Sequence, residues 1–558
     1  MKLLEGDTPE LRAERGAFFT PPAIAGFLAG WAVGGNPHAR VLDPTSGEGV
    51  FLRSAGERLR ALGASDAEIA AQLHGVDVHR ASLYETAALL AEDGLSATLR
   101  EADFFELASP YQLGADVPWV DAVIGNPPFV RYQQHRGEAR RRSVAAALRQ
   151  GVRLSGLASS WAALLVHACS FLHPEGRVAM VVPKELLTVG YAEPIRRWLG
   201  ERFAAVHLVL FEQLQFADAD EQVVLLVARG SGGSGALALH QVADAADLAS
   251  SHLFDAEPVV LGRPEDKWTD LLLPLQRRSR FRTLAATAMT PLSSYGSPTL
   301  GTVTGSNAYF TLSEATREEY EISTSQLQRI VPPGSRHVPG PRFSRGHWQQ
   351  LKADGQRVWL LSPTTNRPTG GLARYIEHGL EKGVDAAYKC TVRDPWWRPP
   401  TIGEPDLLFT YMSHVTPRLV TNDAEVTIVN SLHGLYLRAD APEVVRDALP
   451  LLAMNSATML GAELYGRAYG GGILKMEPRE AGTLPVPDPA TMAAAWKRLR
   501  PCRSRLDRLV RTGHWSEVVE EVDAALLVQT VGMSPGEARE LRTDAARFRR
   551  RRTRREEH

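Results

Sequence analysis

The stretch VLDPTSGEGVFL, residues 41–52, decides the first half of the fold, because a short apolar strand enters a glycine-rich turn that opens a helix. Gly47 and Gly49 permit a tight turn and a close approach of the backbone to a ligand beyond the strand. The turn contains Asp43 and Glu48 but no lysine, so it would repel a pyrophosphate. It predicts either a plain tight turn or a site for a nucleoside cofactor with a cationic amino group and a sulfonium.

The residues around this turn alternate between strand-like and helix-like segments as far as about residue 245. Apolar, β-branched runs predict strands at 39–42, 73–78, 122–124, 178–182, 205–210 and 222–228. Stretches rich in Ala, Leu and Arg predict helices at 51–62, 81–90 and 161–172. The alternation is typical of a doubly wound, Rossmann-like α/β domain with a mostly parallel sheet. Only GSGGSG, residues 230–235, separates the strand at 222–228 from the final strand that follows it, so we expect these two strands to form an antiparallel hairpin.

The sequence changes character at about residue 263, where Pro, Gly and aromatic residues become denser and the alternation ends. We therefore expect three parts: the α/β domain at 1–245, an irregular α+β domain at 263–490, and a helical C-terminal extension at 491–558. The extension ends in RFRRRRTRREEH, residues 547–558. Such a run of like charge is usually a disordered tail, although it would also add attraction to nucleic acid.

Composition limits the class of protein. Of the 558 residues, 44% are hydrophobic and 23% are charged, which excludes a chain that is disordered throughout. The formal net charge is -1, so a nucleic-acid binder would have to gather its basic residues in one cleft. The three cysteines lie far apart, which argues against a disulfide framework and a structural zinc, and we expect no metal. No run of eighteen apolar residues occurs, so we expect no membrane segment and a cytoplasmic protein.

Two further acidic positions extend the predicted nucleoside site. Asp77 follows the second predicted strand, where a carboxylate accepts hydrogen bonds from ribose hydroxyls in other doubly wound proteins. It would also suit the start of a helix, because the helix dipole favours an acid there. Asp103 and Phe104 follow another short apolar step, and together they could accept from an adenine amino group and cover the face of the base.

The most informative motif is DAVIGNPPFVRY, residues 121–132, in which a buried strand runs directly into Asn126, Pro127, Pro128 and Phe129. The two prolines fix φ, remove two N–H donors and push the preceding residues toward extended geometry. The amide oxygen of the asparagine and the first proline carbonyl then become fixed acceptors beside an aromatic ring. This arrangement suits a planar group that bears an –NH2.

The order of these motifs resembles the gamma-type N6-adenine DNA methyltransferases, the TaqI/Eco57I-like family with the Asn-Pro-Pro-Tyr/Phe motif. GAFFTPP, residues 16–22, resembles the N-terminal cofactor motif of that family. The resemblance continues to about residue 490, through segments at 175–187, 211–224, 267–273, 302–312, 388–397, 418–435 and 470–487. The chain departs from the usual pattern in two places. The cofactor loop reads Thr45-Ser46-Gly47-Glu48-Gly49 where Ala-Cys-Gly-Ser-Gly is commoner, which leaves Glu48 without a role, and the fourth residue of the later motif is Phe129 rather than Tyr.

The resemblance implies a catalytic mechanism and roles for particular residues. S-adenosyl-L-methionine is the implied cofactor, with Thr20, Asp43 and Gly47 at its methionine part, Asp77 at its ribose, and Asp103 and Phe104 at its adenine. Asn126 and Pro127 would hold the target N6 amine, and Phe129 and Phe216 would stack on the flipped base.

The implied partner is double-stranded DNA, read by the second half of the chain. Candidate contacts are basic residues interleaved with Trp and Tyr: Arg345, Arg393, Arg398, Arg418, Arg467 and Lys475. The implied setting is the nucleoid of a bacterial cytoplasm, in restriction-modification or phage defence, with any restriction or defence subunit on a separate chain.

Other functions remain open at this level. The same motif serves enzymes that methylate RNA or a protein glutamine, and a non-catalytic DNA-recognition subunit could keep the fold. Cytosine C5 methylation would need a Pro-Cys nucleophile, and Pro501-Cys502 lies far from the predicted sheet. A fused nuclease is suggested only by Asp255 followed by Glu265-Asp266-Lys267.

Overall fold

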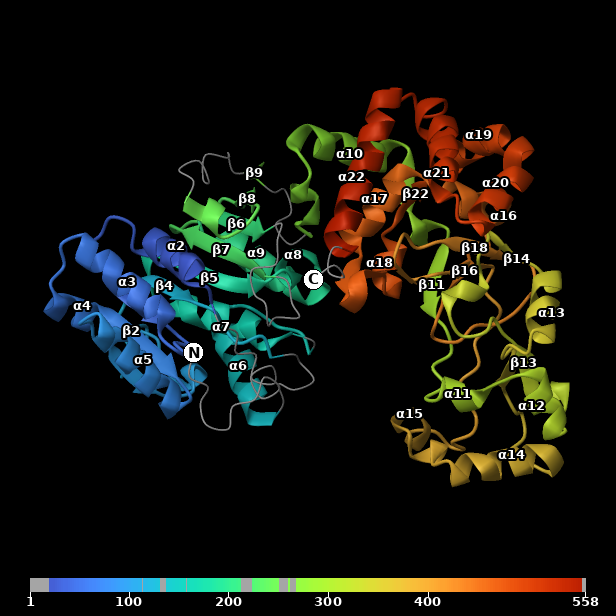
Figure 1. The fold of residues 1–558 in the computed structure, drawn as a ribbon, viewed down its shortest axis with the longest axis horizontal. Coiled ribbons are helices and arrows are strands. Elements are labelled where there is room, and N and C mark those ends of the chain that lie inside the picture. The colour runs from blue at the N-terminus through green and yellow to red at the C-terminus, as the bar shows by residue number, and fades with distance from the viewer. Residues whose placement is uncertain are drawn as a thin grey trace. The chain divides into compact units, whose positions relative to one another are not determined.

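The computed structural model of this protein describes residues 20–112, 114–130, 137–156, 158–211, 223–249, 259–260 and 267–553. Contacts within the chain group it into two units, residues 1–272 and 273–558 (Figure 1). The expected boundary at residue 490 does not separate two units, because the C-terminal helices belong to the second one.

The described strands of the first unit form one sheet in the order β3-β2-β1-β4-β5-β7-β6-β8-β9. Strands β1 to β5 run parallel, and β7 runs antiparallel to both of its neighbours. This arrangement confirms the doubly wound α/β class. The strands are β1 (Val41–Asp43), β2 (Leu73–Asp77), β3 (Thr98–Glu101), β4 (Val120–Gly125), β5 (Leu172–Pro183), β6 (Ala205–Phe211), β7 (Val223–Arg229), β8 (Ala236–Val242) and β9 (Val259–Val260).

Several helices pack directly on this sheet. Helix α2 packs on β4 and β5, α3 on β1 and β2, and α5 on β2 and β3, while α6 packs against α7. The helices are α2 (Pro22–Val33), α3 (Val50–Ala61), α4 (Asp66–Gln72), α5 (Arg80–Glu92), α6 (Gly137–Arg149), α7 (Ser160–Ala168), α8 (Glu185–Thr188) and α9 (Glu193–Arg202), with a 3-10 turn, η1 (Phe104–Glu106), after β3.

The prediction that the strands on either side of residues 230–235 pair with each other is wrong, because β7 and β8 are not neighbours in the sheet. Strand β6 lies between β7 and β8, antiparallel to the first and parallel to the second. The segment 230–235 passes the end of α9, where the N–H groups of Gly233 and Gly235 donate to carbonyls of that helix end. The interior of β6 is buried, and a strand in such a position has both of its backbone edges paired. A short linker therefore did not decide the pairing.

The second unit has an irregular α+β core of four small sheets, as the sequence predicts. The sheets are β10 (Met289–Pro291) with β22 (Pro485–Pro487); β11 (Gly296–Leu300), β19 (His433–Leu437), β16 (Leu407–Phe409), β18 (Leu419–Asn422) and β14 (Arg342–Phe343); β12 (Thr311–Leu312), β15 (Trp359–Leu361) and β13 (Leu327–Arg329); and β17 (Met412–Ser413), β21 (Ile473–Lys475) and β20 (Arg467–Tyr469). These sheets are the ones formed by the residues that the structure describes.

Helices cover the second unit and include almost all of its C-terminal segment. They are α10 (Leu275–Thr287), α11 (Asn307–Phe310), α12 (Glu314–Glu319), α13 (Arg345–Ala353), α14 (Gly370–Glu381), α15 (Tyr388–Thr391), α16 (Val444–Leu452), α17 (Ser456–Tyr465), α18 (Pro478–Gly482), α19 (Pro489–Leu499), α20 (Arg503–Arg511), α21 (Trp515–Asp523) and α22 (Pro535–Thr553).

The disordered tail expected from residue 547 is wrong for residues 547–553, which continue α22. Helix α22 packs along α17. Arg552 is buried, pairs with Glu463 of α17 at 2.8 Å and donates to the carbonyl of His414 at 3.2 Å. The charge run thus has a partner 89 residues earlier in the chain, which local composition does not reveal. Residues 554–558 lie outside the described part.

Candidate active site

The loop after β1 brings the first two predicted carboxylates together. Asp43 ends β1, and its Oδ1 accepts the N–H of Thr45 at 3.1 Å. Gly47 adopts a φ of +50° and donates its N–H to Oδ2 of Asp77 at 3.0 Å. The other oxygen of Asp77 accepts the N–H of His79 at 2.8 Å. The Asp77 carboxylate therefore shapes the glycine turn and keeps lone pairs for further hydrogen bonds.

Gly49 shows how closely this turn is packed. Its φ is +85°, and a Cβ at this position would lie 2.8 Å from the side chain of Thr86 on α5. Only glycine combines this backbone conformation with this close approach. Glu48, the departure from the usual loop sequence, is exposed and takes no part in the packing.

Asp43 is the most strongly perturbed group of the loop. It is fully buried, and burial together with the charge of Asp77 raises its pKa from 3.8 to about 7. Its Oδ2 atom accepts no hydrogen bond from any residue that the structure describes. A buried carboxylate oxygen without a donor is energetically unfavourable, and a cationic amino group would relieve it. The site therefore fits the amino group of a methionine-type ligand.

The Asn-Pro-Pro-Phe turn lies directly beside this loop. Gly125 ends β4 with a φ of +148°, and a Cβ there would lie 2.8 Å from Oδ1 of Asp43. The side-chain N–H of the next residue, Asn126, donates to Oγ1 of the buried Thr20 at 3.2 Å. Residues assigned to the cofactor and to the target amine thus come into contact, although Thr20 and Asn126 are 106 positions apart.

Ser160, the first residue of α7, holds the other end of the turn. Its hydroxyl donates to the carbonyl of Pro128 and accepts the N–H of Val130 at 3.0 Å. Its own N–H donates to the Val130 carbonyl at 3.1 Å. Sequence reasoning missed this residue, and the one signal available was a serine at the start of an apolar helix. Phe129, expected to stack on a base, is buried in the protein as described.

The turn that carries Asp103 is held from two helices. Oδ1 of Asp103 accepts the N–H of Phe105 at 3.0 Å, and Oδ2 pairs with Arg142 of α6 at 3.1 Å. His167 of α7 donates from Nε2 to the carbonyl of Phe104 at 3.1 Å. Burial lowers the pKa of His167 to about 4, so the ring is neutral at physiological pH.

The Phe104 ring does not take the position expected of it. It is only 3% exposed and packs against His167 and Phe171, with ring centroids 5.0 and 5.2 Å away. The ring is therefore part of the core of the unit, and the half-buried Phe105 is the aromatic side chain of this turn that reaches the surface.

Residues 16–19 of the N-terminal motif, Phe216 and the acidic residues 255, 265 and 266 lie outside the described residues. In the part of the chain that the structure describes, no group of three His, Cys, Asp or Glu could hold a metal ion, and no helix is long and apolar enough to cross a membrane. Cys502 lies in the helical C-terminal part of the second unit.

The six candidate DNA-binding residues all make internal contacts. Arg418 is 8% exposed and donates to the carbonyls of Val338 and Pro339, so its guanidinium faces the interior of the unit. Arg393 and Arg398 also donate to backbone carbonyls. The remaining three pair with carboxylates: Arg345 with Glu425, Arg467 with Glu480, and Lys475 with Glu477.

Comparisons with known proteins agree with both halves of this architecture. The family model described as N-6 DNA Methylase matches residues 2–228, and the model of the Type II methyltransferase M.Eco57I C-terminal domain matches residues 265–527. Type II methyltransferase M.AccI of Acinetobacter calcoaceticus is 22% identical over 84% of this chain and 85% of its own length. Type II methyltransferase M.XamI of Xanthomonas campestris pv. amaranthicola is 24% identical over 85% of this chain and 86% of its own length.

A solved structure shows the same fold. The Type IIL restriction-modification enzyme MmeI, determined in complex with DNA, has a TM-score of 0.58 and 13% identity, over 98% of this chain and 80% of the MmeI chain. Two family models that follow each other along nearly the whole chain agree with the motif order read from the sequence. The chain therefore belongs to the Type II DNA methyltransferases that join an N-6 DNA methylase domain to an M.Eco57I-type C-terminal domain.

Proposed function

We propose that this protein transfers a methyl group from S-adenosyl-L-methionine to the N6 amine of an adenine in duplex DNA. The contact between the two motifs supports this most directly: Asn126 donates to Thr20, and Gly125 abuts the buried carboxylate of Asp43. A cofactor held by the first loop would therefore lie next to the acceptors of the target amine.

The cofactor-binding residues follow the carboxylates along the strand ends. We assign Asp43, with Thr20 and Gly47, to the methionine part, Asp77 to the ribose hydroxyls, and Asp103 with the Phe104 turn to the adenine. When bound, this cofactor supplies an electrophilic methyl group on a sulfonium. A cationic amino group near Asp43 would return its pKa toward the ordinary range, since opposite charges favour the ionised form.

The target amine needs acceptors rather than a strong base. An aromatic amine is a poor nucleophile because its lone pair is shared with the ring. Two hydrogen bonds, to the Asn126 side-chain oxygen and the Pro127 carbonyl, favour a pyramidal nitrogen whose lone pair points toward the methyl group. Pro127 and Pro128 fix the turn, and Ser160 holds its far end, so the acceptors are in place before the reaction.

Access to the amine requires base flipping, because the duplex hides it. Stacking on an aromatic ring contributes about 1–3 kcal/mol per base, which offsets most of the energy of unstacking. We assign Phe129 and Phe216 to this stacking. For Phe129 this requires its ring to leave its buried position. We further propose that residues 1–245 catalyse the transfer and that the domain at 263–490, with the extension at 491–558, binds DNA.

The relatives, which are Type II methyltransferases, support a proposal for the biological setting. We propose a role in bacterial restriction-modification or phage defence, within the cytoplasm, with any nuclease on a separate chain. Methylation of RNA or of a protein glutamine is disfavoured, because the match to the M.Eco57I-type domain occupies most of the second half.

Nucleoside mass spectrometry tests the proposal. DNA would be isolated from a host without adenine methylation that expresses the wild-type chain, Asn126→Ala, or Asn36→Ala. Asn36 lies in the loop between α2 and β1, outside the proposed site. We expect N6-methyladenine with the wild type and Asn36→Ala and none with Asn126→Ala. Unmethylated DNA from the wild-type culture, with soluble protein that binds the cofactor, would refute the assignment of DNA adenine as the substrate.

A further inference from the structure

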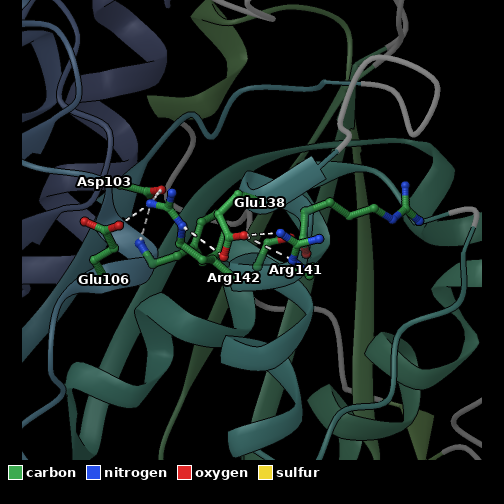
Figure 2. A network of polar contacts seen from close by, with 8 residues as sticks. Asp103, Glu106, Glu138, Arg141 and Arg142 are labelled. Carbon is green, nitrogen blue, oxygen red and sulfur yellow. Dashed lines mark hydrogen bonds and ion pairs between the residues drawn. The ribbon is translucent and has the colours of Figure 1, made fainter.

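Arg142 of α6 connects three carboxylates near the predicted adenine site (Figure 2). Its guanidinium pairs with Asp103 at 3.1 Å, makes a second, shorter contact with Glu106, and lies 3.9 Å from Glu138. Asp103 directly precedes the turn η1 and Glu106 is its last residue, so one side chain joins both ends of that turn to α6. The contact spans 39 positions of sequence.

The orientation of the Asp103 carboxylate is determined by two donors on different oxygens. The backbone N–H of Phe105 binds Oδ1, and Arg142 binds Oδ2. An ionised carboxylate offers about four acceptor positions, so two remain for a ligand. Without Arg142, the contact to Phe105 is the one that would limit rotation about the Cβ–Cγ bond of Asp103 among the residues that the structure describes, because the side chain is partly exposed.

We infer that Arg142 is a positioning residue that orients Asp103 to accept a hydrogen bond from the adenine amino group of the cofactor. This inference rests on the proposed function. Arg142 itself does not touch the cofactor; it acts through the carboxylate. Its side chain is 35% exposed, so solvent screens the pair and the effect of its loss is moderate.

The adjacent Arg141 offers a matched control. It lies on the same helix and pairs with Glu138, but its side chain is 74% exposed and it makes no contact with Asp103 or Glu106 among those described. Arg141→Gln and Arg142→Gln thus make the same chemical change one residue apart, and only the second removes the contact to the predicted adenine site.

The test compares two ligands that differ at the amino group of the base. Calorimetry would measure the Kd of S-adenosylhomocysteine and of S-inosylhomocysteine, in which a carbonyl oxygen replaces that amino group. The wild type should prefer the adenine ligand. Arg142→Gln should weaken binding of this ligand about three- to fivefold and reduce the preference by a similar factor. Arg141→Gln should change neither value, and Arg142→Gln should cause no further loss when Asp103→Asn is already present.

Several results would overturn the inference. An equal loss for both ligands would show that Arg142 only maintains the fold, and tighter binding of the adenine ligand would show that it competes for Asp103. Arg142→Lys keeps the positive charge and covers the case in which Arg142→Gln unfolds. If Arg142→Lys binds the adenine ligand as the wild type does, the guanidinium group that contacts both Asp103 and Glu106 is not needed to orient Asp103. The proposed function is tested separately, since it fails if the wild type binds neither ligand.

Discussion

Asp43→Asn should stabilise the catalytic unit at pH 8 while it weakens cofactor binding. Asparagine keeps an acceptor for the Thr45 N–H and removes the charge that burial disfavours. The pKa of Asp43 is raised from 3.8 to about 7, or about three units, which corresponds to at most about 4 kcal/mol. The folded protein retains the proton of Asp43 where the unfolded chain has released it. The stabilising effect of that proton is therefore complete below about pH 4 and is lost as the pH rises through about 7.

Thermal unfolding of the full chain at pH 5 and pH 8, followed by intrinsic fluorescence, would measure this difference. We expect the Tm advantage of Asp43→Asn over the wild type to be large at pH 8 and small at pH 5. Asp66→Asn serves as the control, because Asp66 is an exposed carboxylate paired with Arg60 at 2.7 Å. An advantage of equal size at both pH values, or a wild type that is the more stable at pH 8, would refute the reasoning. Calorimetry with S-adenosyl-L-methionine should show weaker binding by the same variant, since the counter-charge for its amino group is gone.

Three further predictions concern residues that only the structure reveals. Ser160→Ala removes the hydroxyl contacts to Pro128 and Val130 that hold the end of the Asn-Pro-Pro-Phe turn, which are worth about 1–3 kcal/mol. Single-turnover methylation should therefore slow about tenfold while the Kd of the cofactor stays the same. Ser159→Ala is the control, and an unchanged rate for Ser160→Ala would contradict the role of Ser160. Burial lowers the pKa of His167 to about 4, so the wild type should lose up to about 3 kcal/mol of stability as the pH falls from about 6.5 toward 4. The Tm of His167→Phe should fall less over this pH range. An equal fall in Tm for the two proteins would argue against the burial of a neutral imidazole. Arg552→Ala removes the cation that faces the buried Glu463 and should destabilise the second unit by about 3–5 kcal/mol in urea unfolding, whereas the exposed Arg550→Ala should not; equal effects would mean that the buried pair contributes no more to stability than an exposed arginine.

Motifs governed by local chemistry were predictable from the sequence. The glycine turn after β1 and the strand that ends at Gly125 lie where the sequence placed them, and Asn126, Pro127 and Pro128 leave that strand directly. Glycine conformation and proline geometry act within a few residues, so a reader of the sequence can recognise them. The alternation of strands and helices likewise predicted the doubly wound class.

Pairings across long stretches of sequence were not predictable. The sequence suggested a hairpin across residues 230–235, but β8 pairs with β6. It suggested that Arg418 binds DNA, but this side chain is buried under carbonyl groups of its own unit. It suggested a disordered tail from residue 547, but residues 547–553 continue α22, and Arg552 pairs with Glu463. In each case the partner is a distant residue whose presence composition does not indicate.

The sequence by itself determined which chemical groups are available: the carboxylates at the strand ends, the acceptors of the proline turn and the order of the two halves. The tertiary structure decided which of these groups meet. It brings Thr20 into contact with Asn126 across 106 positions, and it places Arg142 where its guanidinium binds the Asp103 carboxylate. Turns and strands depend on neighbouring residues, whereas contacts between distant residues form only when burial of the whole core brings the chain together.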